Sequence, residues 1–392
     1  MSGTRLYFDY NATTPIDPEV LVVMSAVARD NFGNPSSSHC FGQPAAALVQ
    51  RARLQVARLL RAEADEICFT SGGTESDNLA LKGILLPLLL QGKRPHVIVS
   101  AVEHPAILET CLFLEQAGVE VTRLPVAADG TLNPDQVSAA IRDETILVSL
   151  MLANNETGVI FPLSEISKIT RRHGILLHTD AVQALGKLKI DVSEMGVDLL
   201  SLSGHKIYAP KGVGALWVRT GVELDPLLHG GGQESGRRSG TENLVGIAAL
   251  GRACELLTEN MADEGIRVQR LRDKLESELD AALEQRLVFH GHHQLRVPNT
   301  VSLSVPYVDG EALLAHLDLE NIAVSAGSAC SSGEHQGSPV LRAMGVTPDL
   351  AQGSIRISLG RWTTAAEIDA FLEKFTTIVR RLWAISPLYK NR

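Results

Sequence analysis

The chain carries, near its middle, the stretch Ser201-Leu-Ser-Gly-His-Lys-Ile-Tyr-Ala-Pro-Lys-Gly-Val-Gly214. The apolar run Val197–Leu202, typical of a buried strand, leads into it, and a second strand-like run, Gly214–Val218, follows. The turn between these strands holds a serine, a histidine and a lysine. Burial disfavours the charged form of a lysine, which can make it a nucleophile or a Schiff-base amine. For Lys206 alone, the sequence leaves this role and that of a surface lysine equally open, and Lys211 is the only other lysine nearby.

A regular alternation of strands and helices surrounds this stretch. Apolar runs alternate with amphipathic helices from Val97 to Val218, which predicts a mostly parallel sheet covered on both faces. Ligands of such sheets bind at the carboxyl ends of the strands. We therefore expect the polar residues at four successive strand ends to converge on one site. They are His104, then Asn155, then Asp180 with Gln183, and then Ser203 with His205 and Lys206.

A small-residue turn points to a phosphate. The strand predicted at Glu66–Thr70 runs into Ser71-Gly-Gly-Thr-Glu-Ser-Asp-Asn78, and a helix is predicted from Leu79 onward. This order presents free backbone N–H groups, which can bind a phosphate at a helix N-terminus. The turn matches neither a Walker A loop nor GxGxxG, which argues against a nucleotide. A lysine, a carboxylate, an imidazole and a phosphate-binding turn are together what pyridoxal phosphate requires.

Length and composition limit the class of protein. A chain of 392 residues exceeds one ordinary core, and we predict a large domain at residues 16–258 and a small one at 1–15 plus 259–392. The formal net charge of −9 argues against nucleic acid or an anionic membrane as a partner. The sequence shows neither an apolar signal segment nor a run long enough to span a bilayer. The five cysteines are irregularly spaced without a CxxC pair, which favours a reducing cytoplasm and argues against disulfides or a metal site.

With these motifs in place, the chain resembles the pyridoxal-phosphate-dependent cysteine desulfurases of the NifS/IscS type, in the class V aminotransferase family. The resemblance runs from Tyr7-Phe-Asp-Tyr-Asn-Ala-Thr-Thr-Pro15 to Ser358-Leu-Gly-Arg361. Its most specific pieces are the turn at 71–78, Ser203-Gly-His-Lys206, Arg238-Ser-Gly-Thr241 and Gly327-Ser-Ala-Cys330. It implies an α/β protein of pyridoxal phosphate fold type I. Such a fold has a mostly parallel, seven-stranded type of sheet flanked by helices, and a smaller α+β domain that carries a catalytic cysteine loop.

The resemblance also implies a role for each candidate site residue. Lys206 would form the Schiff base, Asp180 would hold the pyridine nitrogen, and His104 would stack on the ring and assist proton transfer. Gln183 would bond the ring hydroxyl, while Asn155 and Arg356 would take the substrate carboxylate. The remaining cofactor contacts would come from Gly73, Thr74, Ser203, His205, Asn155 and, from the other subunit of a homodimer, Thr241.

The last candidate is a thiol. Cys330 lies among Gly, Ser and Ala, without the apolar neighbours that usually pack a buried cysteine. The resemblance makes it the nucleophile that takes sulfur from L-cysteine as a persulfide and leaves L-alanine. It further implies a sulfur-acceptor protein, such as an iron–sulfur scaffold, for cluster assembly or another sulfur-transfer pathway. Two alternatives stay open: a selenocysteine or cystine lyase on the same fold, and a sulfur-relay docking protein.

Overall fold

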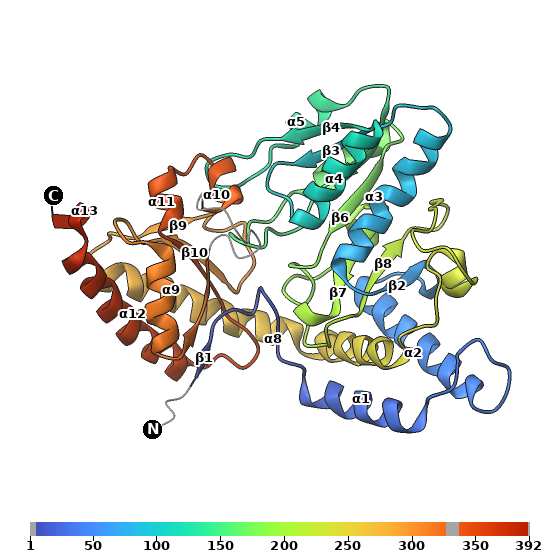
Figure 1. The fold of residues 1–392 in the computed structure, drawn as a ribbon, viewed down its shortest axis with the longest axis horizontal. Coiled ribbons are helices and arrows are strands. Elements are labelled where there is room, and N and C mark those ends of the chain that lie inside the picture. Colours follow the sequence, from blue (N-terminus) through green and yellow to red (C-terminus); the bar gives the residue numbers. More distant parts are fainter. Residues whose placement is uncertain (1–4, 327–336, 391–392) are drawn as a thin grey trace.

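The computed structural model describes residues 5–326 and 337–390, without the side chains of residues 388 and 390. Within these residues the strands form a seven-stranded, a four-stranded and a two-stranded sheet. The seven-stranded sheet and its helices fill one half of the molecule, and the smaller sheets fill the other (Figure 1). The α/β class expected from the sequence is therefore confirmed.

The larger sheet has the strand order β2-β8-β7-β6-β5-β3-β4. Strand β8 is antiparallel to both of its neighbours, and the other pairings are parallel. The link from β7 to β8 is a short turn, too short for the crossover that a parallel pairing needs, so β8 runs backward. The strands are β2 (Ile67–Thr70), β3 (His96–Ser100), β4 (Glu120–Leu124), β5 (Thr145–Ser149), β6 (Leu176–Asp180), β7 (Leu199–Ser203) and β8 (Gly214–Val218).

Helices bury both faces of this sheet. On β3, Val97 and Val99 join the apolar cluster under α3 and α4, whereas Ile98 joins the cluster on the opposite face, as the two-residue period of a strand requires. Helix α3 begins at Gly73, before the expected Leu79, so its first turns include Thr74 and Asp77. The helices around this sheet are α1 (Pro18–Asp30), α2 (Gly42–Leu60), α3 (Gly73–Leu90), α4 (Pro105–Ala117), α5 (Pro134–Ala140), α6 (Leu163–Arg172) and α7 (Val192–Met195), with 3-10 turns η1 (Ala64–Glu66), η2 (Gly204–Lys206) and η3 (Gln233–Gly236).

The four-stranded sheet is antiparallel, in the order β12-β13-β10-β9. Residues 322–326 form two short strands and not one, because β11 pairs with β1 of the N-terminal arm while β12 pairs with β13. This half contains β1 (Leu6–Tyr7), β9 (Val288–His290), β10 (Thr300–Ser304), β11 (Ile322–Ala323), β12 (Ser325–Ala326), β13 (Ser354–Ser358), α9 (Gly310–Leu319), α10 (Pro339–Ala343), α11 (Pro348–Gln352), α12 (Ala365–Ile385) and α13 (Pro387–Lys390).

One long helix, α8 (Leu244–Ala282), runs through both halves (Figure 1). Its residues up to Leu257 pack into the apolar cluster of the larger sheet, and those from Val268 pack into the cluster of the smaller one. The N-terminal arm belongs to the second cluster, where the ring of Phe8 lies 5.0 Å from that of Phe371. This anchor sends the next arm residues toward the larger sheet. Among the described residues, none of the helices combines the length and apolar character needed to cross a bilayer.

Candidate active site

One cavity of about 170 Å³ lies where the carboxyl ends of the parallel strands meet the start of α3. It collects the residues predicted from successive strand ends, and adds four that the sequence did not single out. The lining residues are Gly73, Thr74, Asp77, His104, Met151, Ala153, Asn155, Asp180, Val182, Gln183, Ser203, His205 and Lys206.

The start of α3 supplies one end of the cavity with hydrogen-bond donors. The first N–H groups of a helix have no partner within the helix, and they favour an anion. A side chain at Gly73 would place its Cβ 2.8 Å from Cγ2 of Val182, so only glycine allows this close approach of α3 to the turn after β6. The hydroxyls of Thr74 and Ser203 line the same cavity. Burial lowers the pKa of His205 to about 4, helped by the charges of Lys206 and Lys211, so its imidazole is neutral.

Two buried carboxyl groups lie deeper in the cavity. Asp180 Oδ1 accepts a hydrogen bond from Val182 N at 2.8 Å, and burial raises the pKa of Asp180, while this hydrogen bond and the charge of Lys206 oppose that rise. Burial raises the pKa of Asp77 well above its ordinary value, and the charge of Asp180 adds to the shift. Two neighbouring carboxylates in an apolar interior do not both ionise. We infer that Asp77 holds a proton and that Asp180 carries the negative charge.

Asp77 was not predicted as a site residue, because the helix was expected to begin only after it. With α3 starting at Gly73, Thr74 and Asp77 are three residues apart and share one helix face, which places both in the cavity. His178 Nε2 lies 3.8 Å from Asp77 Oδ1 and bonds Ser201 Oγ at 2.9 Å. Burial lowers the pKa of His178 to about 3, so this histidine is a neutral support for the strand ends.

His104 lines the cavity from the end of β3. It is also the N-cap of α4, where its Nδ1 accepts a hydrogen bond from Ala106 N at 3.1 Å. Burial lowers the pKa of His104, so the ring is neutral and its proton is on Nε2. The cap therefore fixes both the tautomer and the position of the ring.

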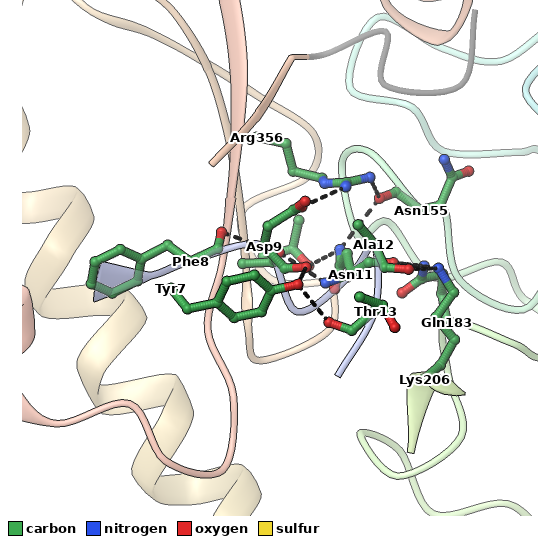
Figure 2. A network of polar contacts seen from close by, with 12 residues as sticks. Tyr7, Phe8, Asp9, Asn11, Ala12, Thr13, Asn155, Gln183, Lys206 and Arg356 are labelled. Atoms are coloured by element: carbon green, nitrogen blue, oxygen red, sulfur yellow. Dashed lines mark hydrogen bonds and ion pairs between the residues drawn. The ribbon is translucent and has the colours of Figure 1, made fainter. Parts of the chain in front are cut away.

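Lys206 meets the N-terminal arm. Its Nζ donates to the main-chain oxygens of Asn11 at 2.6 Å and Ala12 at 2.8 Å. Gln183 Nε2 donates to the same oxygen of Asn11 at 2.9 Å. Figure 2 shows both side chains reaching the arm. The arm thus closes one side of the site, a role that the sequence did not reveal.

Two further lysines, Lys211 and Lys187, bear on the assignment of Lys206. Lys211 is exposed, as a surface lysine would be. Lys187, which was not predicted, contacts the site through Gln183. Its Nζ donates to Gln183 Oε1 at 2.7 Å. It was missed because its partners come from the fold and not from its sequence neighbours.

Arg356, on β13, lies beside the cavity without lining it. Its Nη1 donates to the main-chain oxygen of Asn155 at 2.9 Å, and its Nη2 forms an ion pair with Asp9 Oδ1 at 3.0 Å (Figure 2). Among the described residues, Arg356 Nε and Asn155 Oδ1 are buried without a hydrogen-bond partner. A buried donor and a buried acceptor left unpaired are costly, and a polar ligand would satisfy them.

Two predicted residues remain, Thr241 and Cys330. Thr241 is exposed on the stretch between η3 and α8, and it does not line the cavity in this chain. Cys330 lies outside the described residues. No group of three or more His, Cys, Asp or Glu side chains within the described ranges could hold a metal ion.

The donor set of the cavity fits pyridoxal phosphate. The start of α3 with the hydroxyls of Thr74 and Ser203 suits a phosphate, since all of these groups donate hydrogen bonds. The carboxylate of Asp180 suits a protonated ring nitrogen, and Lys206 supplies an amine for an aldehyde. A neutral His104 can lie against an aromatic ring without repelling it.

Known proteins resemble this chain over nearly its whole length. The chain matches the family Aminotransferase class-V over residues 6–371. It is 47% identical over 387 residues to a cysteine desulfurase IscS of Dictyoglomus turgidum, covering 99% of this chain and 97% of that one. It is 49% identical over 388 residues to a cysteine desulfurase IscS of an Anaeromyxobacter species, covering 98% of this chain and 95% of that one.

A solved NifS-like protein superposes with a TM-score of 0.91 at 38% identity, covering 97% of this chain and all of the other. A NifS-like protein from Rickettsia africae gives 0.87 at 34%, covering 96% and 100%. The chain belongs to the class V aminotransferase family and, within it, to the cysteine desulfurases.

Proposed function

We propose that this chain is a pyridoxal-phosphate-dependent enzyme that converts L-cysteine to L-alanine and retains the sulfur on Cys330 as a persulfide. The observation that carries the proposal is the meeting of Lys206, Asp180 and His104 with phosphate-type donors in one cavity. The full-length relatives named cysteine desulfurase support the substrate. They give no support to the selenocysteine or cystine lyase alternative.

Pyridoxal phosphate, when bound, supplies an electron sink for negative charge that develops next to the substrate's amino group. In this proposal Gly73, Thr74, Ser203 and His205 hold its phosphate. The Asp180 carboxylate keeps the ring nitrogen protonated, because a nearby negative charge favours the cationic form.

Lys206 would hold the cofactor and then act as the base. Its Nζ bonds two main-chain oxygens, and it must leave them before it can move a proton at the substrate's α-carbon. Neutral His104, with a proton on Nε2, is a donor for the substrate side of the site. The arm residues exclude water from the side of the cavity that they cover.

Sulfur transfer needs a thiolate, because the thiolate and not the thiol is the nucleophile. The Cys330 sulfur would form a bond to the substrate sulfur while the substrate's C–S bond breaks. The electron pair of that bond passes to the substrate's β-carbon, which takes up a proton and becomes the methyl group of alanine. The substrate sulfur is oxidised to the persulfide level and the carbon is reduced, so no further oxidant is required. Arg356 and Asn155 would hold the substrate carboxylate meanwhile.

The proposal includes the assembly and its surroundings. The division into residues 16–258 and 1–15 plus 259–392 is supported by the change of apolar cluster along α8, although Val340 and Leu341 of α10 pack with the larger cluster. A homodimer in which Thr241 completes the partner's phosphate site fits the exposed position of this residue. We also retain a cytoplasmic location and a sulfur-acceptor protein, such as an iron–sulfur scaffold, as parts of the proposal.

The test is to incubate the purified chain with L-cysteine and a thiol reductant, and to measure alanine, sulfide and pyruvate. We expect alanine and sulfide in equal amounts and no pyruvate, without any partner protein. Pyruvate in place of alanine would indicate elimination of sulfide and contradict the proposal. Faster turnover of L-selenocysteine or L-cystine would favour the lyase alternative, and turnover only with a partner would favour the docking alternative.

A further inference from the structure

The turn that follows β6 carries a lysine that the proposed mechanism does not use. Lys187 Nζ donates to Gln183 Oε1 at 2.7 Å and to Asn11 Oδ1 at 3.0 Å. Gly186, with a φ of +76°, makes the tight turn that brings Lys187 back toward Gln183, and residues other than glycine rarely adopt this φ. Lys187 thereby connects two segments. One is the turn after β6, which lines the cavity, and the other is the N-terminal arm.

Hydrogen-bond chemistry fixes the orientation of the Gln183 amide. The main-chain oxygen of Asn11 can only accept, so the amide atom 2.9 Å from it is the nitrogen Nε2. The oxygen Oε1 then faces Lys187, which donates to it. Both contacts demand the same orientation. Since Nε2 carries two hydrogens and Asn11 takes one, the second is available at the wall of the cavity that Gln183 lines.

The Asn11 side chain is held just as firmly. Its Oδ1 accepts from Lys187 and also from Asn299 Nδ2 at 3.0 Å, and its Nδ2 donates to Thr300 Oγ1 at 2.8 Å. Asn299 and Thr300 belong to the half of the molecule that contains the smaller sheets. Lys187 is therefore attached to a fixed point, and it cannot move without breaking its bonds to Asn11 and Gln183.

The position of Lys187 is electrostatically unfavourable. Burial lowers the pKa of Lys187 well below its ordinary value, and the charges of Lys206 and Arg356 lower it further. An interior amine among cations costs free energy unless its hydrogen bonds offset the cost. Its nitrogen has hydrogens for both oxygen acceptors whether or not it is charged. An apolar side chain would avoid the cost but leave Gln183 Oε1 unbonded and the amide free to rotate.

We propose that Lys187 is a positioning residue, which holds Gln183 with an N–H directed into the cavity for an acceptor oxygen on the ring of pyridoxal phosphate. This inference rests on the proposed function, since it assumes that the cavity takes this cofactor. Lys187 acts only through Gln183, and it does not itself touch the reacting atoms.

The test compares cofactor binding by full-length variants. The dissociation constant for pyridoxal phosphate and the visible absorption spectrum of the bound cofactor are measured for the wild type and for K187M, K187R, Q183L and the double variant K187M/Q183L. The matched control is K189M, which makes the same change at an exposed lysine two residues away. Thermal unfolding of the cofactor-free proteins shows whether each variant folds, and Lys187→Gln replaces K187M if the latter does not.

We expect K187M to weaken cofactor binding by about tenfold or more, the effect of losing a hydrogen bond to a charged or strongly polar group, and to shift the visible absorption. K187R, which can still donate to both oxygens, should recover most of the binding. K189M should behave as the wild type. Because Lys187 acts through Gln183, the double variant should bind no more weakly than Q183L.

Two results would overturn the inference while leaving the proposed function intact: wild-type binding and spectrum in K187M, or effects of K187M and Q183L that multiply in the double variant. A wild-type chain that binds no pyridoxal phosphate would overturn the proposed function, and the inference with it. The two failures are therefore distinguishable.

Discussion

Lys206 Nζ donates to the main-chain oxygen of Asn11 across 2.6 Å, although the two residues are 195 positions apart in the sequence. The arm that carries Asn11 is anchored by Phe8 in the apolar cluster of the smaller sheets. The same arm thus contacts the proposed reactive lysine and the half of the molecule that contains the smaller sheets. The strands of that half lie on both sides of Cys330 in the sequence. The position of the amine therefore depends on both halves of the structure.

Substitution K206A should abolish turnover and covalent attachment of the cofactor. Borohydride reduction of the wild type, followed by peptide mass spectrometry, should place the cofactor on the peptide that contains Lys206, because among the described residues this is the lysine that lines the cavity. Lys187, the other lysine bonded to Gln183 and Asn11, should remain unlabelled in the wild type. The comparison variant K187M should keep the label on Lys206. A label on Lys187, or a label that persists in K206A, would show that the assignment is wrong.

Substitution D180N should lower the rate by about 100-fold or more, the usual cost of losing a charge that stabilises the transition state. The cofactor-free protein should unfold at the same or a higher temperature, because ionising this buried carboxyl group costs folding free energy. D77N is the matched comparison. It should cost less activity, since an asparagine resembles the protonated carboxyl group that we infer at Asp77. Equal losses in the two variants would contradict the division of charge between them.

Substitution E156Q should change how stability depends on pH. Glu156 is buried beside Ser338, and burial raises its pKa to about 7 from the usual 4.5. The folded state therefore keeps a proton that the unfolded state releases, so this contribution is full below pH 4.5 and is lost as the pH rises through 7. The loss amounts to about 3 kcal/mol at most. A glutamine stays neutral, and the Ser338 hydroxyl can accept from its amide.

Urea unfolding at pH 5 and pH 8 measures this effect. E156Q should be more stable than the wild type at pH 8, with a smaller difference at pH 5. E165Q, at an exposed position of α6, should track the wild type at both pH values. If E156Q and the wild type lose the same stability between pH 5 and pH 8, Glu156 is not protonated in the folded state.

Substitution R356K should raise the KM for L-cysteine by about tenfold or more and leave the cofactor content unchanged. Lysine keeps the charge but loses the planar fork that bonds a carboxylate with two parallel N–H groups. R361K gives a matched control, because Arg361 also forms ion pairs with carboxylates, those of Asp17 and Glu264. A KM that is unchanged in R356K would remove Arg356 from the substrate site.

Sequence patterns were enough to predict the strand-end residues. His104, Asn155, Asp180 and Lys206 follow apolar runs, and parallel strands bring their carboxyl ends to one edge of a sheet, so a local pattern predicts a spatial cluster. The error at α3 was also local. The glycines of the turn at 71–78 obscured a helix start at Gly73, and Asp77 was missed for that reason.

The rest of the site depends on contacts that no local pattern contains. Asp9 reaches Arg356 across 347 positions, and Lys187 reaches Asn11 across 176. Polar residues in an N-terminal arm or a turn look like ordinary surface residues until the fold places them. The division of residues 322–326 into β11 and β12 was also not predictable from a local pattern, because it follows from the different strands with which they pair.

The most direct test of the central claim is the amount of alanine formed from L-cysteine by the wild type and by the variants C330A and C330S. The wild type should form alanine, and brief exposure to L-cysteine should add one sulfur atom to the peptide that contains Cys330. Both variants should bind the cofactor normally but form no alanine, since a hydroxyl is a poorer nucleophile at neutral pH and cannot hold a persulfide. Alanine formed by C330A at the wild-type rate would contradict sulfur transfer to Cys330 and favour a lyase that acts without this thiol.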